Sequence, residues 1–427
     1  MPSSVYFGKT KNNRFSVSDN IKYKYDEMCN ISEVRENGVL TAKYTYDRIG
    51  RLVREDNRKF GKTWLWSYDN CGNILFKREA QFTLKPTEGI EEYIDEKMYA
   101  YNGDKLLSFG DEILFYTDTE GKEHVNPLIY RGQQLSWSFE RRLASFGDNT
   151  FVYDGYGRRI RKNDTVFTYD ANNKLVKQSD GTNTLEFVYD NNGLSGVTLN
   201  GVAYIYCKDI QSNIVSMLDS TGKEVVQYRY DAWGNVKTEV IDEAHALIAE
   251  LNPFGYRSYY YDGETHLYYL NTRYYDPETG RFISQDDVSY IRPNKISGVN
   301  LFAYCRNNPV MQVDPSGHIP IANYITKIQF TKLIGGFDSF WWGRVNYSVT
   351  KLIEQYPEEI GIFYAHTTYE NGYFTGGAGI NLGGWLGVNI GVSGLPQEYN
   401  LSIGVNITPW FHASWSIGGN GLSISFG

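Results

Sequence analysis

Residues 44–53 read YTYDRIGRLV, and variants of this stretch return along the first half of the chain. Aromatic and polar side chains alternate up to Tyr46-Asp47. Gly50 follows, and a second alternating run begins at Leu52. Alternation places successive side chains on opposite faces of a β-strand, and an Asp followed by Gly within three residues is typical of a tight turn. Each copy of the stretch therefore predicts a β-hairpin.

The Tyr-Asp pair is the most regular feature of this repeat. Full copies occur at Tyr25-Asp26, Tyr46-Asp47, Tyr68-Asp69, Tyr153-Asp154, Tyr169-Asp170, Tyr189-Asp190 and Tyr230-Asp231, and degenerate copies at Tyr101-Asn102 and Tyr206-Cys207. One hairpin cannot bury its apolar face alone, so the copies are expected to pair side by side in one long sheet. The repeated spacing favours a structural role, with each Asp accepting hydrogen bonds from its own turn.

The composition agrees with a folded β protein and excludes some functions. The 427 residues include 36 Tyr and 42 Gly but 12 Pro, and 41% are hydrophobic. The net charge of -8 disfavours binding to a nucleic-acid backbone. No apolar run is long enough for a transmembrane helix, and the start of the sequence lacks the apolar core of a signal peptide. We therefore expect either a piece of a longer protein or export by a non-classical route.

A denser block follows the repeats. Residues 252–287 read NPFGYRSYYYDGETHLYYLNTRYYDPETGRFISQDD, and residues 300–318 read NLFAYCRNNPVMQVDPSGH. Residues 276–280 predict a turn between strands at 267–275 and 281–284, because Asp-Pro and Gly favour turns. A short helix is expected at 243–251, with Asp242 as its N-cap.

The Tyr-Asp copies and this block resemble the Rhs/YD-repeat family, which includes bacterial polymorphic toxins, C subunits of insecticidal toxin complexes and teneurins. The resemblance implies a mainly β fold, in which YD hairpins form a spiralling β-sheet shell. It further implies an N-terminal segment at 1–19, a YD shell at 20–251, an Rhs-associated core at 252–318 and a variable C-terminal effector domain at 319–427.

Many members of this family cut their own chain after the core by an aspartic-protease-like reaction. Such a reaction needs one ionised carboxyl to activate water and one protonated carboxyl to donate to the scissile carbonyl. The residues that match the family's cleavage positions are Asp286, Asp314 and Arg273, and the scissile bond would be His318–Ile319.

Two departures from the family pattern bear on this prediction. Asp287 stands in place of a proline, and His318 stands in place of a leucine. The alternative is that the two aspartates and Arg273 only cap turns and form an ion pair.

The tail after residue 318 has a different pattern. Helix-like spacing covers 321–334, and a second helix is expected at 349–356 before Pro357. Alternation then predicts an antiparallel meander of about five short strands, so the tail is expected to be a small α+β domain. An ordinary soluble sheet and a membrane-inserting β-structure both fit this alternation.

No recognisable catalytic motif marks the tail. Its histidines are His366 and His412, and the carboxylates considered as their partners are Glu370, Glu398 and Asp338. A lone His is more often structural, and four Lys or Arg against six Asp or Glu disfavour a polyanionic substrate. No metal or other cofactor is expected, and whether the tail is an enzyme stays open.

The resemblance implies a secreted or cell-surface polymorphic toxin component for interbacterial competition, whose shell sheathes and delivers the tail. Its expected partners are a cognate immunity protein, a delivery apparatus and the target-cell surface. The alternative function is a non-toxic adhesive YD-repeat protein that binds carbohydrate or a partner protein.

Overall fold

The computed structural model describes residues 4–6, 20–139, 141–190, 193–290, 300–318 and 320–322, together with tail strands between 363 and 426. The chain divides into two compact units, Met1–Thr326 and Lys327–Gly427, and each is described by itself.

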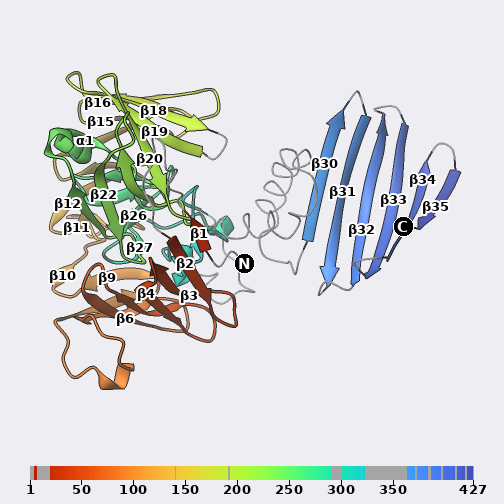
Figure 1. Cartoon of the computed structure of the whole chain (residues 1–427). Helices are drawn as coiled ribbons and strands as arrows, with labels where there is room; N and C mark the ends of the chain where they lie inside the picture. The colour runs from red at the N-terminus through yellow and green to blue at the C-terminus, as the bar shows by residue number, and fades with distance from the viewer. Residues whose placement is uncertain are drawn as a thin grey trace. The chain divides into compact units, whose positions relative to one another are not determined.

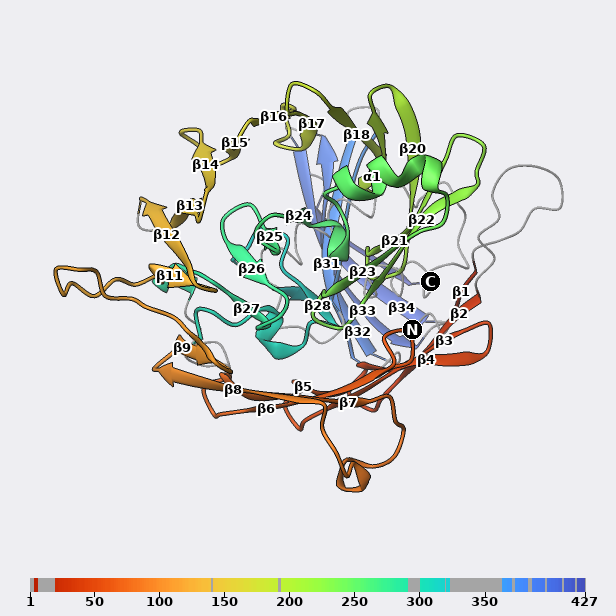
Figure 2. The ribbon, with the colours of Figure 1, turned by 90° about the vertical axis from the view of Figure 1, so that its left-hand side faces the viewer.

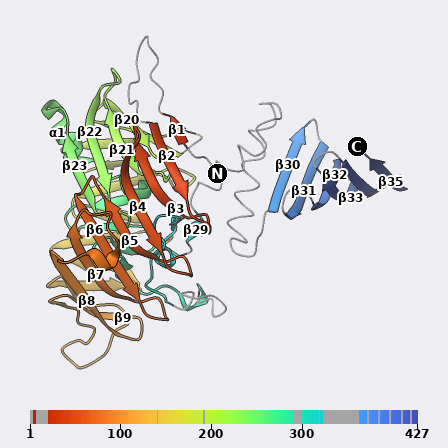
Figure 3. The same ribbon diagram turned by 60° about the horizontal axis from the view of Figure 1, so that its bottom comes forward.

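Two antiparallel sheets, each with its strands in sequence order, form most of the first unit (Figures 1 and 3). The first contains β1 (Ser4–Tyr6), β2 (Asn20–Tyr25), β3 (Ile31–Glu36), β4 (Val39–Tyr46), β5 (Leu52–Asn57), β6 (Lys62–Tyr68), β7 (Ile74–Gln81), β8 (Asp95–Asn102), β9 (Lys105–Phe109) and β10 (Glu112–Ile113). The second contains β11 (Ile129–Tyr130), β12 (Gln133–Ser138), β13 (Arg142–Phe146), β14 (Asn149–Tyr153), β15 (Arg159–Lys162), β16 (Thr165–Tyr169), β17 (Leu175–Ser179), β18 (Thr184–Asp190), β19 (Gly193–Leu199), β20 (Val202–Lys208), β21 (Ile214–Leu218), β22 (Glu224–Tyr230) and β23 (Val236–Val240).

The prediction of one continuous sheet is therefore wrong. Between β10 and β11 the chain runs without regular pairing, and an isolated bridge joins Phe115 to Ile129. The Tyr-Asp pattern is absent from this stretch, and Pro127 cannot donate a backbone hydrogen bond to a ladder. The turn chemistry persists here, since Asp118 Oδ1 accepts from the backbone N–H groups of Glu120 at 3.0 Å and Lys122 at 2.9 Å. The ladder is therefore interrupted where regular strand pairing is lost.

The aspartate of most Tyr-Asp pairs organises the turn that follows it, as predicted. In the first clear copy, Asp47 Oδ1 accepts hydrogen bonds from the backbone N–H groups of Ile49 at 3.1 Å and Arg51 at 2.9 Å. Gly50 has a φ of +85°, a left-handed conformation that glycine adopts without steric cost. The same contacts to the second and fourth following residues recur at Asp69, Asp154, Asp170, Asp209, Asp219 and Asp231.

The tyrosine of most pairs connects its hairpin to the preceding one by a hydrogen bond. The Tyr46 hydroxyl donates to the Ile31 carbonyl at 2.8 Å, and the Tyr230 hydroxyl donates to the Ile214 carbonyl at 2.8 Å. Equivalent bonds are made by Tyr68, Tyr101, Tyr153, Tyr169 and Tyr189. A register shift falls at most of these tyrosines, including Tyr46 and Tyr189. Because bulges bend a strand and increase its twist, the repeat itself curves the wall (Figure 2).

A core segment lies inside the ring formed by the curved sheets (Figure 2). Its sheet contains β24 (Tyr260–Asp262), β25 (Leu267–Tyr269), β26 (Tyr274–Asp276) and β27 (Arg281–Phe282), and β28 (Gln312–Val313) pairs with β29 (Ile321–Ala322). Buried tyrosines attach this segment to the shell: the hydroxyls of Tyr256, Tyr275 and Tyr268 donate to the carbonyls of Ala232, Trp233 and Gly234, respectively. The core therefore fills the shell interior with aromatic side chains that also satisfy shell carbonyls.

Two local predictions for the core can be compared with its structure. The predicted helix is confirmed as η2 (Glu243–His245) and α1 (Ala246–Leu251), and the Asp242 side chain accepts from the Ala244 N–H. The continuous strand predicted at 267–275 is wrong, because a turn separates β25 from β26. Asn271 has a φ of +63°, and the Leu270 N–H donates to the Arg273 carbonyl at 2.9 Å. The strand expected at 281–284 is confined to β27.

The second unit contains a six-stranded antiparallel meander in sequence order. Its strands are β30 (Phe363–Glu370), β31 (Tyr373–Leu382), β32 (Leu386–Leu395), β33 (Glu398–Thr408), β34 (Phe411–Gly418) and β35 (Gly421–Phe426). The predicted meander is confirmed, with one strand more than expected. Ile321–Ala322 is a strand rather than the start of a helix, and the rest of the two predicted tail helices lies outside the described residues. Among the residues that the structure describes, no helix has the length and apolar character needed to cross a membrane.

Candidate self-cleavage site

Arg273 occupies the turn before β26 and is buried in the core, with 4% of its side chain exposed. Its guanidinium carbon lies 3.5 Å from the centre of the Phe282 ring. Its Nη1 donates to the Leu301 carbonyl at 2.8 Å, and its Nε donates to the Gly317 carbonyl. These contacts fix the guanidinium between β27 and the segment that leads to the tail.

Both predicted aspartates lie beside this guanidinium. Asp286 follows β27, and its Oδ2 lies 3.0 Å from Arg273 Nη2. Asp314 follows β28, and its Oδ2 lies 3.8 Å from the same nitrogen. Both carboxyl groups are buried, at 5% and 1% exposure of the side chain. The fold therefore brings the three residues that the sequence predicted into one cluster.

Asp314 lies in an environment that favours its protonated form. Its Oδ1 accepts from the backbone N–H groups of Gly317 at 2.9 Å and His318 at 3.0 Å, which wraps the chain around the carboxyl group. Its Oδ2 is buried and has no hydrogen-bond partner among the described residues. Burial, reinforced by the charge of Asp286 and opposed by Arg273, raises the pKa of Asp314 above its ordinary value.

His318 contacts Asp286 through its ring. His318 Nδ1 lies 2.6 Å from Asp286 Oδ1, and the Asp287 backbone N–H donates to the same oxygen at 2.7 Å. The side chain of Asp287 points to another partner, the exposed Arg141. The Ser289 backbone N–H, together with Arg141, lowers the pKa of Asp287 to about 2. Ile319, on the other side of the predicted scissile bond, lies outside the described residues.

The cluster has the parts that a hydrolytic cut requires. One carboxyl group is held in its ion-paired form by an arginine, and the other has a raised pKa and a free oxygen beside that pair. The residue before the predicted scissile bond touches both groups.

Sequence reasoning missed two members of this cluster. His318 was predicted only as the residue before the scissile bond, and the pairing of its ring with Asp286 was not foreseen. Tyr259 accepts a hydrogen bond from the Asp314 N–H at 2.8 Å through its hydroxyl oxygen. Tyr259 stands among many structural tyrosines, and nothing in its local sequence distinguishes it.

The catalytic candidates in the tail are not brought together. His366 lies in β30 and His412 in β34, with three strands of the same sheet between them. At about 4.8 Å per strand, their backbones are roughly 19 Å apart. Glu370 is the last residue of β30, and Glu398 is the first residue of β33. Asp338 lies outside the described residues. In the described part of the chain, no group of three or more His, Cys, Asp or Glu side chains is placed to hold a metal ion.

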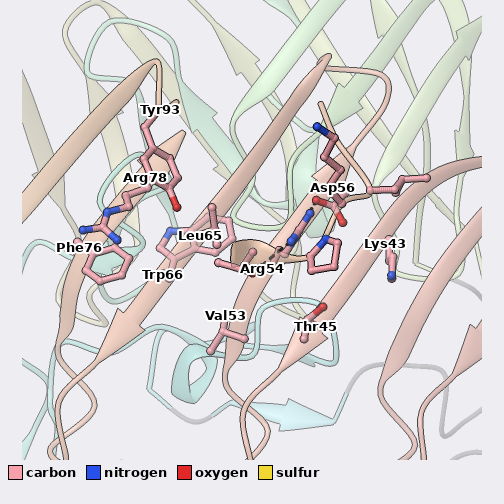
Figure 4. A pocket seen from close by; sticks show the side chains of 14 residues that line it. Lys43, Thr45, Val53, Arg54, Asp56, Leu65, Trp66, Phe76, Arg78 and Tyr93 are labelled. Atoms are coloured by element: carbon pink, nitrogen blue, oxygen red, sulfur yellow. Dashed lines mark hydrogen bonds and ion pairs between the residues drawn. The ribbon is translucent and has the colours of Figure 1, made fainter. Parts of the chain in front are cut away.

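A separate cleft of about 440 Å³ lies over strands β4 to β7 (Figure 4). Arg54 is buried at its floor, donating to Asp56 at 2.8 Å and to the Thr83 carbonyl at 3.1 Å. At its rim Arg78 lies over the rings of Phe76 and Tyr93. The guanidinium of Arg54 binds the loop after β7, so a structural role accounts for this buried arginine at the floor of the cleft.

Repeated hairpins curved into a wall, with an aromatic core segment inside it, define a YD-repeat shell protein. Residues 192–310 match the family described as Teneurin YD-shell. Together with the relatives described next, this match confirms the resemblance to the Rhs/YD-repeat family that was seen in the sequence.

Two relatives with similar sequences are a nuclease and a deaminase toxin. The chain is 32% identical over 289 residues to the tRNA3(Ser)-specific nuclease WapA of Bacillus spizizenii, a match that covers 64% of this chain and 12% of the relative. It is 26% identical over 337 residues to the double-stranded DNA deaminase toxin A of Burkholderia cenocepacia, covering 66% and 23%. The chain therefore spans less than a quarter of either relative.

A solved structure shows the same fold. The crystal structure of TcdB2-TccC3 without hypervariable C-terminal region matches with a TM-score of 0.54 and 19% identity, covering 74% of this chain and 18% of the other. This likeness supports the mainly β, shell-forming architecture.

Proposed function

We propose that this chain is the shell and effector part of an Rhs-type polymorphic toxin. In this proposal residues 20–251 form the sheath, residues 252–318 form the core, and residues 319–427 are the effector that is released by a cut at His318–Ile319. The observation that carries the proposal is the buried contact of Asp286 and Asp314 with Arg273, directly before the tail.

The proposed cut is a hydrolysis by two carboxyl groups. Asp286, ionised beside Arg273, accepts a proton from water as the water oxygen bonds to the His318 carbonyl carbon. Asp314, whose raised pKa favours the protonated form, donates its proton to the carbonyl oxygen. The tetrahedral diol then collapses: one hydroxyl returns its proton to Asp314 as the carbonyl reforms, the carbon–nitrogen bond breaks, and the Ile319 nitrogen leaves with the proton held by Asp286. The chain supplies every group that this sequence of steps uses.

Self-cleavage is tested by following the intact mass of the purified 49.0 kDa chain over time. We expect a fragment that ends at His318 and one that begins at Ile319. Asp286→Asn and Asp314→Asn each remove a proton-transfer group, and we expect either substitution to slow the cut by at least about 100-fold. Asp287→Asn is the matched control, because this carboxylate faces Arg141 outside the cluster. A cut that persists in both cluster variants would contradict the proposed mechanism.

The effector role of the tail is tested by growth. Expression of the full chain in a bacterial cytosol is expected to arrest growth, whereas the same chain ended at His318 is expected to leave growth unchanged. Rescue by a cognate immunity protein would agree with the proposal. Normal growth with both chains would instead favour the adhesive function, in which the shell binds carbohydrate or a partner protein and no toxin is released. Both functions would require secretion of the protein or its display at the cell surface.

A further inference from the structure

His318 is held by both carboxyl groups of the candidate site. Its backbone N–H donates to Asp314 Oδ1 at 3.0 Å, while its ring nitrogen Nδ1 lies 2.6 Å from Asp286 Oδ1. The residue whose carbonyl would be attacked is thus bound at two points, once through its backbone and once through its side chain.

The ring occupies an oxygen that the reaction needs. A carboxylate oxygen has about two acceptor positions. The two donors on Asp286 Oδ1 are the His318 ring and the Asp287 N–H at 2.7 Å, so this oxygen is filled. The other oxygen, Oδ2, faces Arg273 at 3.0 Å. A water molecule on the His318 side of Asp286 must therefore compete with the imidazole.

We propose that His318 is a gating residue for the self-cleavage: its imidazole occupies Asp286 Oδ1 and withholds the attacking water until the ring turns away. This inference rests on the proposed function. The ring is 26% exposed whereas Asp286 is 5% exposed, so the ring has a path to solvent that the carboxyl group lacks. Cleavage is then slow in the resting shell and fast once the ring is displaced.

The test compares two substitutions of His318 in the full chain by the same intact-mass measurement. His318→Leu introduces an apolar side chain of similar reach and removes the ring nitrogen that contacts Asp286. We expect the cut to become at least about tenfold faster, because a hydrogen bond to a charged group is lost. His318→Asn places a side-chain N–H near the position of Nδ1, and we expect a rate within about threefold of the unsubstituted chain. If His318 acted only through packing, His318→Leu would not be cut faster than His318→Asn.

The outcomes distinguish the gate from the proposed function. If the unsubstituted chain is cut and His318→Leu is no faster, or if His318→Asn is as fast as His318→Leu, the gate is wrong and self-cleavage stands. If neither the unsubstituted chain nor His318→Leu is cut, self-cleavage itself is wrong. The faster cut must also disappear when Asp286→Asn is added to His318→Leu. Because the expected result is a gain of cleavage, a misfolded variant cannot imitate it.

Discussion

Replacing Arg159 with methionine is expected to lower the free energy of unfolding of the shell unit by about 3–5 kcal/mol. Arg159 lies in β15 of the shell wall, and its Nη1 pairs with Asp262 at the end of β24 in the core. Both side chains are at most 1% exposed. Without the arginine, the Asp262 carboxylate would remain buried with Lys162 Nζ, 3.0 Å away, as its remaining cationic partner.

The surroundings of Arg159 explain why this cost is large. Its guanidinium lies 4.3 Å from the ring centre of Tyr269 and 4.8 Å from that of Tyr260, and its Nη1 donates to the Tyr274 hydroxyl at 3.1 Å. Burial disfavours its charge, but Asp262 and the surrounding tyrosines outweigh that effect and raise the pKa of Arg159. The positive charge is therefore bound firmly in the native state, and its removal leaves the buried Asp262 carboxylate with Lys162 as its remaining cationic partner.

The measurement is urea unfolding of the full chain, with amide hydrogen exchange locating the change to β15 and β24. Arg161→Met is the matched control, since Arg161 lies on the same strand and pairs with Asp164 at the surface, where the two side chains are 54% and 91% exposed. Equal effects of the two substitutions would show that the buried pair does not attach the core to the wall.

Raising the pH from 5 to 9 is expected to lower the free energy of unfolding of the shell by roughly 2–4 kcal/mol through Glu55. Burial raises the pKa of Glu55 from 4.5 to about 8, and the negative charge of the nearby Asp231 adds to this effect. Glu55 is thus protonated in the folded state between about pH 4.5 and 8, whereas in the unfolded chain it is ionised. Folding takes up a proton in this window, so stability is greatest below it and falls as the pH rises through it.

Glu55 lies at a contact between the two large sheets of the shell. It belongs to β5 of the first sheet, and its Oε2 accepts from the Ala232 N–H at 2.9 Å in the turn between β22 and β23 of the second sheet. Asn57 supports this contact by donating to Glu55 Oε1 at 2.9 Å and to the Tyr230 carbonyl at 3.4 Å. Ionisation of Glu55 beside Asp231 would therefore weaken this contact between the two sheets first.

The pH effect is measured by urea unfolding at a series of pH values. Glu55→Gln removes the titrating group and is expected to flatten the curve between pH 5 and 9. Glu186→Gln, at an exposed position on β18, is the control and is expected to leave the curve unchanged. A curve that keeps its slope in Glu55→Gln would assign the pH dependence to other groups.

Much of the shell could be predicted from local sequence because its key contacts lie within one hairpin or between neighbours. Asp47 binds the turn that it precedes, Gly50 supplies the left-handed φ of that turn, and Tyr46 bonds to the adjacent hairpin. Where a single strand was predicted at 267–275, by contrast, the packing of the core imposes a turn at Asn271 that alternation does not indicate.

The sequence predicted three residues of the candidate site but not the contacts between them. Asp286, Asp314 and Arg273 were chosen by resemblance, and their mutual contact depends on three loops that meet around β27. The pairing of His318 with Asp286 spans 32 residues and has no counterpart in local pattern. The tail histidines, which equally lacked a motif, are separated by the strand order of their sheet.

By itself, then, the sequence of this protein determined the hairpins, their turns and the curvature of the wall, because each depends on hydrogen bonds between residues close along the chain. The tertiary structure alone decided how Glu55 joins the two sheets, how Arg159 binds the core, and which side chain contacts Asp286. These contacts join residues more than thirty positions apart, and burial sets their charge states. Local pattern contains neither the distance nor the loss of water that makes such pairs form.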